Sequence, residues 1–216
     1  MSITFTTAPT APDDADVLAV LVAEGGASHP ALDADVLERL GFEAKVGSTR
    51  VLPGADGGLV AVAGLGPVDD VDEDAVRKAG AARTRALDRH TTIAVELGDT
   101  AAVDRRGAAQ ALGEGLALGA YSYDRFKSEP DPSKIDAVVV LSDDDDVAEG
   151  LQRAARVTEA VCWARDLGNT PGGTLTPEEL AAAAIEMGER EGPEAHVLDH
   201  DAILEARLGG RLGVNR

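Results

Sequence analysis

The strongest constraint on the fold is the regular alternation of short β-branched stretches with longer segments of helical periodicity. Strand-like stretches occupy residues 3–7, 17–22, 49–52, 59–65, 92–97, 135–141 and 196–198. Helical patterns lie between them, at residues 33–40, 72–88, 105–123, 147–167, 177–189 and 202–208. Because the two kinds of segment alternate, the sequence predicts an α/β fold in which helices cover a sheet.

The core of such a sheet must be built from small and aliphatic side chains. Hydrophobic residues make up 44% of the 216 residues, whereas aromatic residues make up only 3%. Alanine, valine and leucine therefore carry most of the packing, which suits helices lying closely on a sheet and argues against a disordered chain. A chain of this length can bury one good-sized core, or one domain and the opening of a second.

The charge excludes several classes of partner. There are 39 acidic and 20 basic residues, which give a formal net charge of -19. A field of this sign repels nucleic acid and anionic membranes, and we interpret the acidic residues as a solubilising surface. The single cysteine, Cys162, allows neither an intramolecular disulfide nor a zinc site of several cysteines.

The sequence has no sign of export or membrane insertion. Residues 1–10 lack the basic start and apolar centre of a signal peptide. The longest apolar run, residues 17–23, is far shorter than a membrane-spanning helix. We therefore expect a cytoplasmic protein without a membrane partner.

Several helix ends are marked in the second half of the chain. Four aspartates at residues 143–146 precede a helical pattern, where carboxylates stabilise a helix N-terminus. The alternative, a calcium-binding loop, fits poorly because its twelfth position would be Arg156. The glycines between Gly168 and Gly173 predict the end of that helix and an irregular linker at a domain boundary. Thr176 and Glu179 form a capping box that begins the next helix.

The segment after this linker is short. Residues 176–216 contain only two helical patterns and one strand-like stretch. A segment of this size buries too little apolar surface to form an independent core. We therefore expect an unfinished second domain.

A search for catalytic constellations finds none in this sequence. None of the seven serines stands in the Gly-x-Ser-x-Gly context of a nucleophile elbow. None of the four lysines lies beside a cluster of acidic residues suited to metal binding or proton transfer. His196 and His200 are four residues apart, as in helical metal sites. The residues around them predict a strand, however, in which the two rings would diverge. We therefore nominate no catalytic, cofactor-binding or metal-binding residue.

Three patterns allow both a binding and a structural interpretation. Residues 64–67 (GLGP) follow a strand, as a phosphate-binding turn would. The third glycine of the dinucleotide-binding fingerprint is absent, because position 69 is Asp69, and this favours a plain turn. Gly113, Gly115 and Gly119 lie in a helical pattern, which favours close helix packing over phosphate binding. Residues 121–127 (YSYDRFK) could stack bases, although a helix end packed on the sheet or a subunit contact suits an acidic chain better.

Three further segments carry a family resemblance. Residues 164–177 (ARDLGNTPGGTLTP) fit the pattern Arg-Asp-Leu-x-Asn-Thr-Pro-x-x-x-Leu-Thr-Pro, and residues 208–214 (LGGRLGV) fit Gly-Gly-x-x-Gly-Val. A weaker similarity covers residues 114–128. Together these segments resemble the leucyl aminopeptidases, or cytosol aminopeptidases (peptidase family M17). The first pattern lies at the junction of that family's two domains, and the second lies early in its catalytic domain.

The resemblance implies a fold, an activity and an assembly. It implies a macro-like mixed α/β sheet flanked by helices at residues 1–167. Residues 168–216 would then be a linker and the incomplete start of an α/β catalytic domain. In this family the catalytic domain holds two divalent metal ions, Zn²⁺ or Mn²⁺, and removes N-terminal residues from peptides. The family's enzymes assemble into hexamers.

The family's metal ligands do not fall within this chain. They lie in segments resembling Lys-Gly-x-Thr-x-Asp-Ser-Gly-Gly and Asn-Thr-Asp-Ala-Glu-Gly-Arg, which come after the point where this sequence stops. We therefore predict a non-catalytic N-terminal portion that holds no cofactor and is inactive alone. Two alternatives remain open: a freestanding macro-like domain that binds a nucleotide sugar, and a module that assembles subunits.

Overall fold

The computed structural model describes residues 3–26, 29–54 and 57–210. Its strands are β1 (Thr4–Ala8), β2 (Val17–Glu24), β3 (Thr49–Pro53), β4 (Leu59–Pro67), β5 (Thr92–Glu96) and β6 (Ala137–Leu141). Its helices are α1 (Ala34–Arg39), the short 3-10 helix η1 (Val68–Asp70), α2 (Glu73–Ala86), α3 (Arg105–Ala120), α4 (Asp145–Asn169), α5 (Pro177–Glu191) and α6 (His200–Glu205). None of the helices in these ranges is long and apolar enough to cross a membrane.

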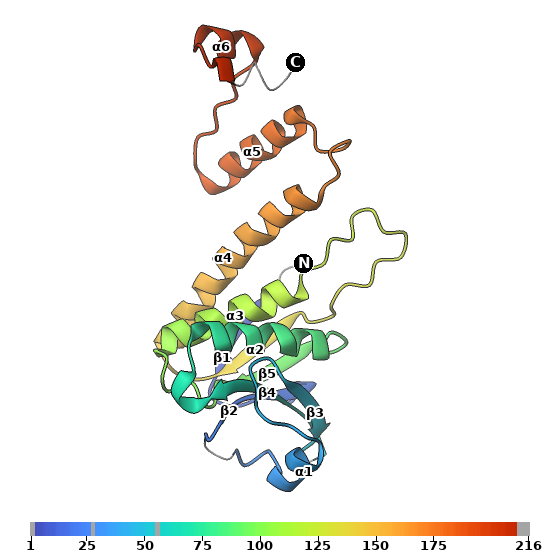
Figure 1. The fold of residues 1–216 in the computed structure, drawn as a ribbon, viewed down its shortest axis with the longest axis vertical. Coiled ribbons are helices and arrows are strands. Elements are labelled where there is room, and N and C mark those ends of the chain that lie inside the picture. Colours follow the sequence, from blue (N-terminus) through green and yellow to red (C-terminus); the bar gives the residue numbers. More distant parts are fainter. Residues whose placement is uncertain (1–2, 27–28, 55–56, 211–216) are drawn as a thin grey trace. The chain divides into compact units, whose positions relative to one another are not determined.

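The strands form one mixed sheet in the order β1-β6-β5-β2-β4-β3. Neighbouring strands are parallel except β3 and β4, which are antiparallel. Figure 1 shows α2 and α3 along one face of this sheet and α1 on the other side. The predicted mixed α/β sheet flanked by helices is therefore confirmed.

The core lies on both faces of the sheet because side chains alternate along each strand. On β2, Ala19 and Leu21 belong to a large apolar cluster that includes residues of α2 and α3. Val20 and Val22 point the other way, into a smaller cluster against which Phe42 packs. Strands covered on both faces are apolar throughout, which explains why they were recognisable as short apolar runs.

Glycines let the helices on the larger cluster approach closely, as their helical pattern predicts. A Cβ atom on Gly115 of α3 would overlap the carbonyl oxygen of Arg77 on α2. A Cβ on Gly80 of α2 would lie 2.9 Å from the Leu112 carbonyl oxygen. These distances are shorter than van der Waals contact, so α2 and α3 can cross at this separation only with glycine at the crossing.

Carboxylate and hydroxyl side chains begin the helices. The Asp104 carboxylate accepts a hydrogen bond from the Gly107 N–H at 2.8 Å, which caps α3. The Asp144 carboxylate accepts a hydrogen bond from the Asp146 N–H at 3.0 Å, and it forms an ion pair with Arg105 Nε at 3.2 Å. The Thr176 hydroxyl accepts from Glu179 at 3.3 Å, with Pro177 as the first residue of α5. The predicted start at Thr176 is therefore confirmed. The aspartates at 143–146 do mark a helix start, but α4 begins at Asp145, two residues before the predicted start at 147.

Of two predicted elements near the C-terminal end, the strand is wrong and the helix is present with shifted bounds. Residues 196–198 form no strand, and the side chains of Val197 and Leu198 are exposed. A strand needs a neighbour for its backbone groups, and no described strand pairs with this stretch. The helix predicted at 202–208 instead begins at His200, because Asp199 caps it by accepting from the Ala202 N–H at 2.9 Å.

Two helix ends also differ from the prediction. Helix α3 ends at Ala120 rather than at residue 123, because Tyr121 has an extended backbone. Gly168 does not end α4, which continues to Asn169. The next residue, Thr170, precedes Pro171, and the residue before a proline avoids the helical conformation. The proline rather than the glycine therefore accounts for the end of α4.

Backbone contacts divide the chain into two compact units, Met1–Ala164 and Arg165–Arg216. The division falls within α4, three residues before the boundary predicted between 167 and 168. The sheet and its two apolar clusters belong to the first unit. The assignment of 1–167 and 168–216 to two domains stays a prediction.

Candidate functional site

The carboxyl ends of β2 and β5 form the candidate site of this fold. These strands are neighbours, but the chain leaves β2 toward β3 and leaves β5 toward β6, on opposite sides. Open α/β sheets bind ligands outside the carboxyl ends of their strands, at the point where the connections diverge in this way. The side chains at this point therefore make up the candidate site.

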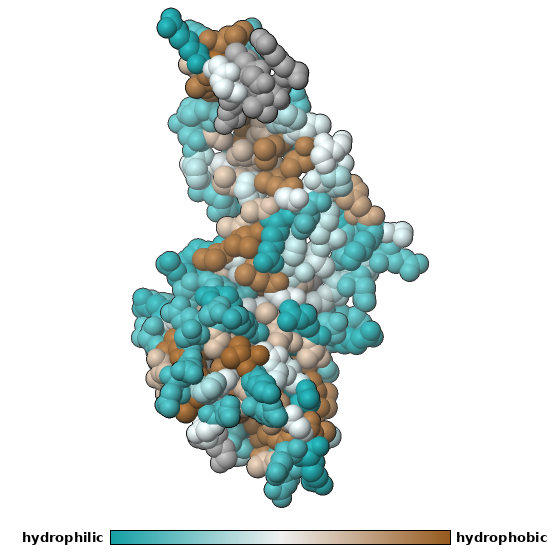
Figure 2. All heavy atoms as spheres, in the orientation of Figure 1, coloured by the Kyte–Doolittle hydropathy of each residue, from teal (hydrophilic) through white to brown (hydrophobic). Residues whose placement is uncertain are grey.

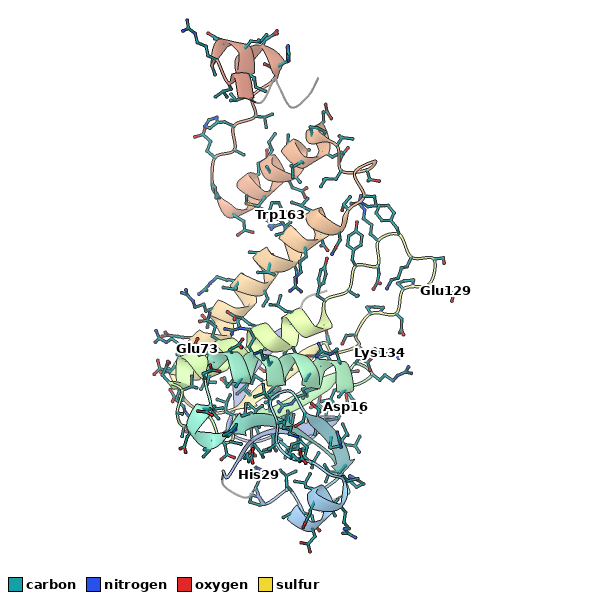
Figure 3. The ribbon with its side chains drawn as sticks, viewed as in Figure 1. Asp16, His29, Glu73, Glu129, Lys134 and Trp163 are labelled. Carbon is teal, nitrogen blue, oxygen red and sulfur yellow. The ribbon has the colours of Figure 1, made fainter. Side chains whose placement is uncertain are left out.

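Three titratable side chains lie at these strand ends, and two of them are in contact. His29 Nε2 lies 2.6 Å from Glu96 Oε2, and His29 Nδ1 accepts a hydrogen bond from the Ala31 N–H at 3.1 Å. Since Nδ1 is an acceptor, the hydrogen atom of the ring is on Nε2, which donates a hydrogen bond to the Glu96 carboxylate. Asp99 Oδ2 accepts from the Ala23 N–H at the end of β2, at 3.0 Å. Figure 3 labels His29 beside the sheet.

These contacts fasten loops to the sheet rather than leaving reactive groups free. Both ring nitrogens of His29 are hydrogen-bonded, and Asp99 holds the end of β2. Gly98 has a φ of 58° and lies against the Leu21 carbonyl oxygen, where a side chain would not fit. In the described ranges, no group of three or more histidine, cysteine, aspartate or glutamate side chains could hold a metal ion.

An open hollow of about 570 Å³ lies next to the end of β2. Its lining consists of Glu24, Phe42, Glu43, Ala44 and Lys45. Lys45 pairs with Glu43, and this hydrogen-bonded ion pair lowers the pKa of the Glu43 carboxyl. Two carboxylates against one ammonium make the hollow negative at neutral pH. A phosphate or a nucleotide sugar is therefore disfavoured there.

The segment at residues 64–67, for which a plain turn was predicted and a phosphate-binding turn was the alternative, lies inside β4 instead of in a turn. The Gly64 N–H donates to the Ser48 carbonyl oxygen at 2.9 Å, and the Gly66 N–H donates to the Ala44 carbonyl oxygen at 2.8 Å. The segment that contains Ala44 and Lys45 thus takes the space that a phosphate would need. The nucleotide-sugar hypothesis was motivated by the inferred macro-like fold and by this turn, and it loses the support of the turn.

Substituting Gly64 tests this close approach. A Cβ at Gly64 would overlap the carbonyl groups of Ala44 and Lys45, so Gly64→Ala should lower the free energy of unfolding by about 2 kcal/mol. Gly173→Ala is the matched control, because no heavy atom lies within 4 Å of the added carbon. Urea denaturation measures both, and equal midpoints for the two variants would contradict the packing described for Gly64.

His196 and His200, which were not nominated as a metal pair, lie in two different local structures. His196 lies in an irregular segment, 3.5 Å from Glu194 Oε1, and its side chain is 74% exposed. His200 is the first residue of α6. The two imidazoles therefore stand in different local structures, and the periodicity of one helix does not align them.

The aromatic and basic segment is an exposed loop rather than a helix end packed on the sheet. The rings of Tyr123 and Phe126 have centroids 6.1 Å apart, and Arg125 lies 5.6 Å above the Phe126 ring. Phe126 is 56% exposed. Hydrogen bonds from Lys127 and Ser122 lower the pKa of the Asp124 carboxyl. The alternative, a subunit contact, stays a prediction.

Comparison with known proteins identifies the fold and its family. Residues 26–130 match the model of the "Cytosol aminopeptidase family, N-terminal domain". The chain carries the N-terminal domain of the cytosol aminopeptidase family. The carboxyl-end cluster of His29, Glu96 and Asp99 lies within this matched range, as does the helical part of residues 114–128 that suggested the family.

Relatives named as cytosol aminopeptidases extend the similarity beyond this domain. The protein of Rhodococcus erythropolis is 32% identical over 210 residues, covering 94% of this chain and 38% of the relative. The protein of Streptomyces avermitilis is 36% identical over 200 residues, covering 84% of this chain and 38% of the relative. The chain therefore spans less than two fifths of the length of these two curated relatives.

Solved structures share the fold. The bottromycin maturation enzyme BotP is 33% identical with a TM-score of 0.74, covering 83% of this chain and 38% of BotP. A tomato leucine aminopeptidase has a TM-score of 0.79 at 22% identity, covering 95% of this chain and 46% of that chain. The fold of a leucine aminopeptidase N-terminal region is thus confirmed. Residues 211–214 of the second predicted motif lie outside the described residues.

No sequence pattern indicates the carboxyl-end cluster directly. His29 and Glu96 are 67 positions apart and meet only because β2 and β5 are neighbours in the sheet. A usable signal did exist in the residues that follow each strand. Gly25 and Gly26 follow β2, while Gly98 and Asp99 follow β5 closely, and such glycine and acidic residues mark functional or tightly packed strand ends.

Proposed function

We propose that this chain is the N-terminal, non-catalytic portion of a leucyl aminopeptidase-like metallopeptidase that removes N-terminal amino acids from peptides. The observation that carries the proposal is the match of residues 26–130 to the family's N-terminal domain. Peptide substrates would be reached only through a catalytic domain that follows it. The similarity to relatives continues past residue 130, which supports a link to such a domain.

The apolar surface of the second unit supports the assignment of residues 168–216 to the start of a catalytic domain. Gly188 is the only buried residue of α5, and α6 has none. Large apolar side chains are exposed at Leu180, Ile185, Val197, Leu198, Leu204 and Leu208. Figure 2 shows this apolar surface over α5 and α6. Exposed apolar side chains at this density mark a surface made for contact with further protein.

Two divalent metal ions, Zn²⁺ or Mn²⁺, would supply the water activation of the longer enzyme. BotP has been solved in complex with Mn. The described residues of this chain do not fit such ions, since their acidic and histidine side chains form no metal-holding group. We therefore place the ions in the catalytic domain and assign no catalytic step to residues of this chain.

The remaining features of the proposed enzyme follow from the same assignment. We propose a cytoplasmic location, in keeping with relatives named as cytosol aminopeptidases. We also propose assembly of the longer enzyme into hexamers. The net charge of -19 argues against a nucleic-acid partner.

A domain graft tests the proposed function. Residues 1–167 would replace the aligned N-terminal portion of the Rhodococcus erythropolis relative, and the chimera would be assayed for release of leucine from a leucyl peptide with Mn²⁺ present. We expect activity within about tenfold of the parent enzyme, because the catalytic portion is unchanged. The control is the parent enzyme without any N-terminal portion. A folded, metal-loaded chimera that releases no leucine would overturn the proposal.

A further inference from the structure

The outer edge of β1 is a row of backbone groups that no described strand pairs. β1 stands at the end of the strand order. On its inner side, the Thr4 N–H donates to the Asp136 carbonyl oxygen at 2.8 Å, and the Ser142 N–H donates to the Ala8 carbonyl oxygen at 2.8 Å. The alternating residues 4, 6 and 8 therefore bond to β6. The backbone groups of Phe5 and Thr7 face outward.

The two edges of the sheet differ in how they resist pairing. The opposite edge strand, β3, carries Arg50 and ends at Pro53, two residue types that protect an edge from another strand. β1 has the sequence TFTTA and contains neither a charge nor a proline. Thr4 and Thr6 are exposed on it. An uncharged and unprotected edge strand is a template for another strand.

We propose that β1 pairs antiparallel with β1 of a second copy of this chain, about a two-fold axis at Thr6. In this register Phe5 faces the partner's Thr7, and both residues present outward N–H and C=O groups. The two symmetry-related pairs then form four hydrogen bonds, as hydrogen-bonded pairs of an antiparallel ladder do. Thr6 meets the partner's Thr6 in the closer, non-hydrogen-bonded pair, which suits two threonines. The two six-stranded sheets become continuous.

A second copy matches this edge because the outward groups of Phe5 and Thr7 lie symmetrically about Thr6 on a strand that carries no charge. Each copy carries a net charge of -19, so two copies repel one another over most of their surfaces. The uncharged β1 edge is a place where their backbones can meet without opposing carboxylates in the strands. A two-fold contact also uses the same patch on both subunits, and hexamers with dihedral symmetry contain such axes. The contact is thus compatible with the proposed hexamer but does not depend on it.

Salt should strengthen the pairing. At about 1 M NaCl the Debye length falls to about 3 Å, so repulsion between the two acidic copies is screened. We expect sedimentation equilibrium of the full 1–216 chain, in a concentration series up to about 1 mM, to show a monomer–dimer equilibrium that shifts toward dimer with salt. A chain that stays monomeric at every concentration and salt level overturns the proposal.

Substitutions in β1 identify the contact surface. Thr7→Pro removes an outward N–H and leaves the bonds to β6, so we expect the dissociation constant to rise at least about tenfold with the melting temperature nearly unchanged. Thr7→Val keeps the N–H and is the matched control, with unchanged dimerisation. Should the proline variant fail to fold, Thr6→Glu serves instead, because it places two exposed carboxylates opposite each other at the axis. A dimer that the folded variant leaves intact shows that the copies meet elsewhere, and overturns the proposal.

Discussion

Gly115→Ala is expected to lower the free energy of unfolding by about 3 kcal/mol, although glycine to alanine inside a helix usually raises it. The added Cβ would overlap the Arg77 carbonyl oxygen and lie 2.9 Å from the Arg77 carbonyl carbon. Backbone atoms of α2 cannot turn aside as a flexible side chain could. The two helices must therefore separate, which opens the apolar cluster beneath them.

The matched control is Gly168→Ala in the last turn of α4. No heavy atom lies within 4 Å of a Cβ there, so the higher helix propensity of alanine should act alone and raise the free energy of unfolding by up to about 1 kcal/mol. Urea denaturation followed by circular dichroism measures both changes. Opposite signs support the close crossing of α2 and α3, whereas a stabilised Gly115→Ala variant would show that the helices lie further apart.

Arg83→Met is expected to stabilise the fold by about 2 kcal/mol at neutral pH. Arg83 is fully buried on α2, and its Nη2 donates to the Val20 carbonyl oxygen at 3.1 Å. Its Nε and Nη1 atoms find no partner among the described residues. A cation buried with a single neutral acceptor costs more than an apolar side chain of similar volume, even after the loss of that hydrogen bond.

The pH dependence gives the same substitution a second readout. Burial lowers the pKa of Arg83 to about 9 from its ordinary value of 12.5. Between these two values the unfolded chain binds more protons than the folded chain, so the contribution of Arg83 to stability rises with pH. Below about pH 9 the cost of burying the charge is fully present.

Urea unfolding of both proteins at pH 7 and at about pH 10.5 isolates this contribution. We expect the advantage of the methionine variant to shrink at the higher pH, because the wild-type guanidinium can lose its proton there. Other alkaline titrations affect both proteins equally and cancel in the difference. A methionine variant less stable than wild type at pH 7 would show that Arg83 is better solvated than its burial indicates.

The elements of the sheet were predictable because each carries its own signal. The four inner strands β6, β5, β2 and β4 are largely buried on both faces, so each appears as a separate apolar, β-branched run. The edge strands β1 and β3 keep exposed residues and were recognisable from their β-branched residues alone. The failed strand at residues 196–198 had the same local composition as the others but no neighbour to pair with. Composition reports the suitability of a segment for a sheet, whereas only the fold reveals whether a partner strand is present.

The candidate site was much less predictable than the fold. His29, Glu96 and Asp99 belong to segments that are adjacent only through the strand order β5-β2. No local pattern specifies that order. The glycines of α3 were predictable as packing residues because they recur within a helical pattern, yet the sequence could not show that Arg77 would be their neighbour.

The most direct test of the central claim is an aminopeptidase assay of the purified 1–216 chain alone. The chain would be incubated with Leu-p-nitroanilide and an excess of Zn²⁺ or Mn²⁺, with the intact Rhodococcus erythropolis relative as the positive control. The account predicts no release of p-nitroaniline above the protein-free blank. Release that increases with the amount of chain and stops on addition of a chelator would contradict it.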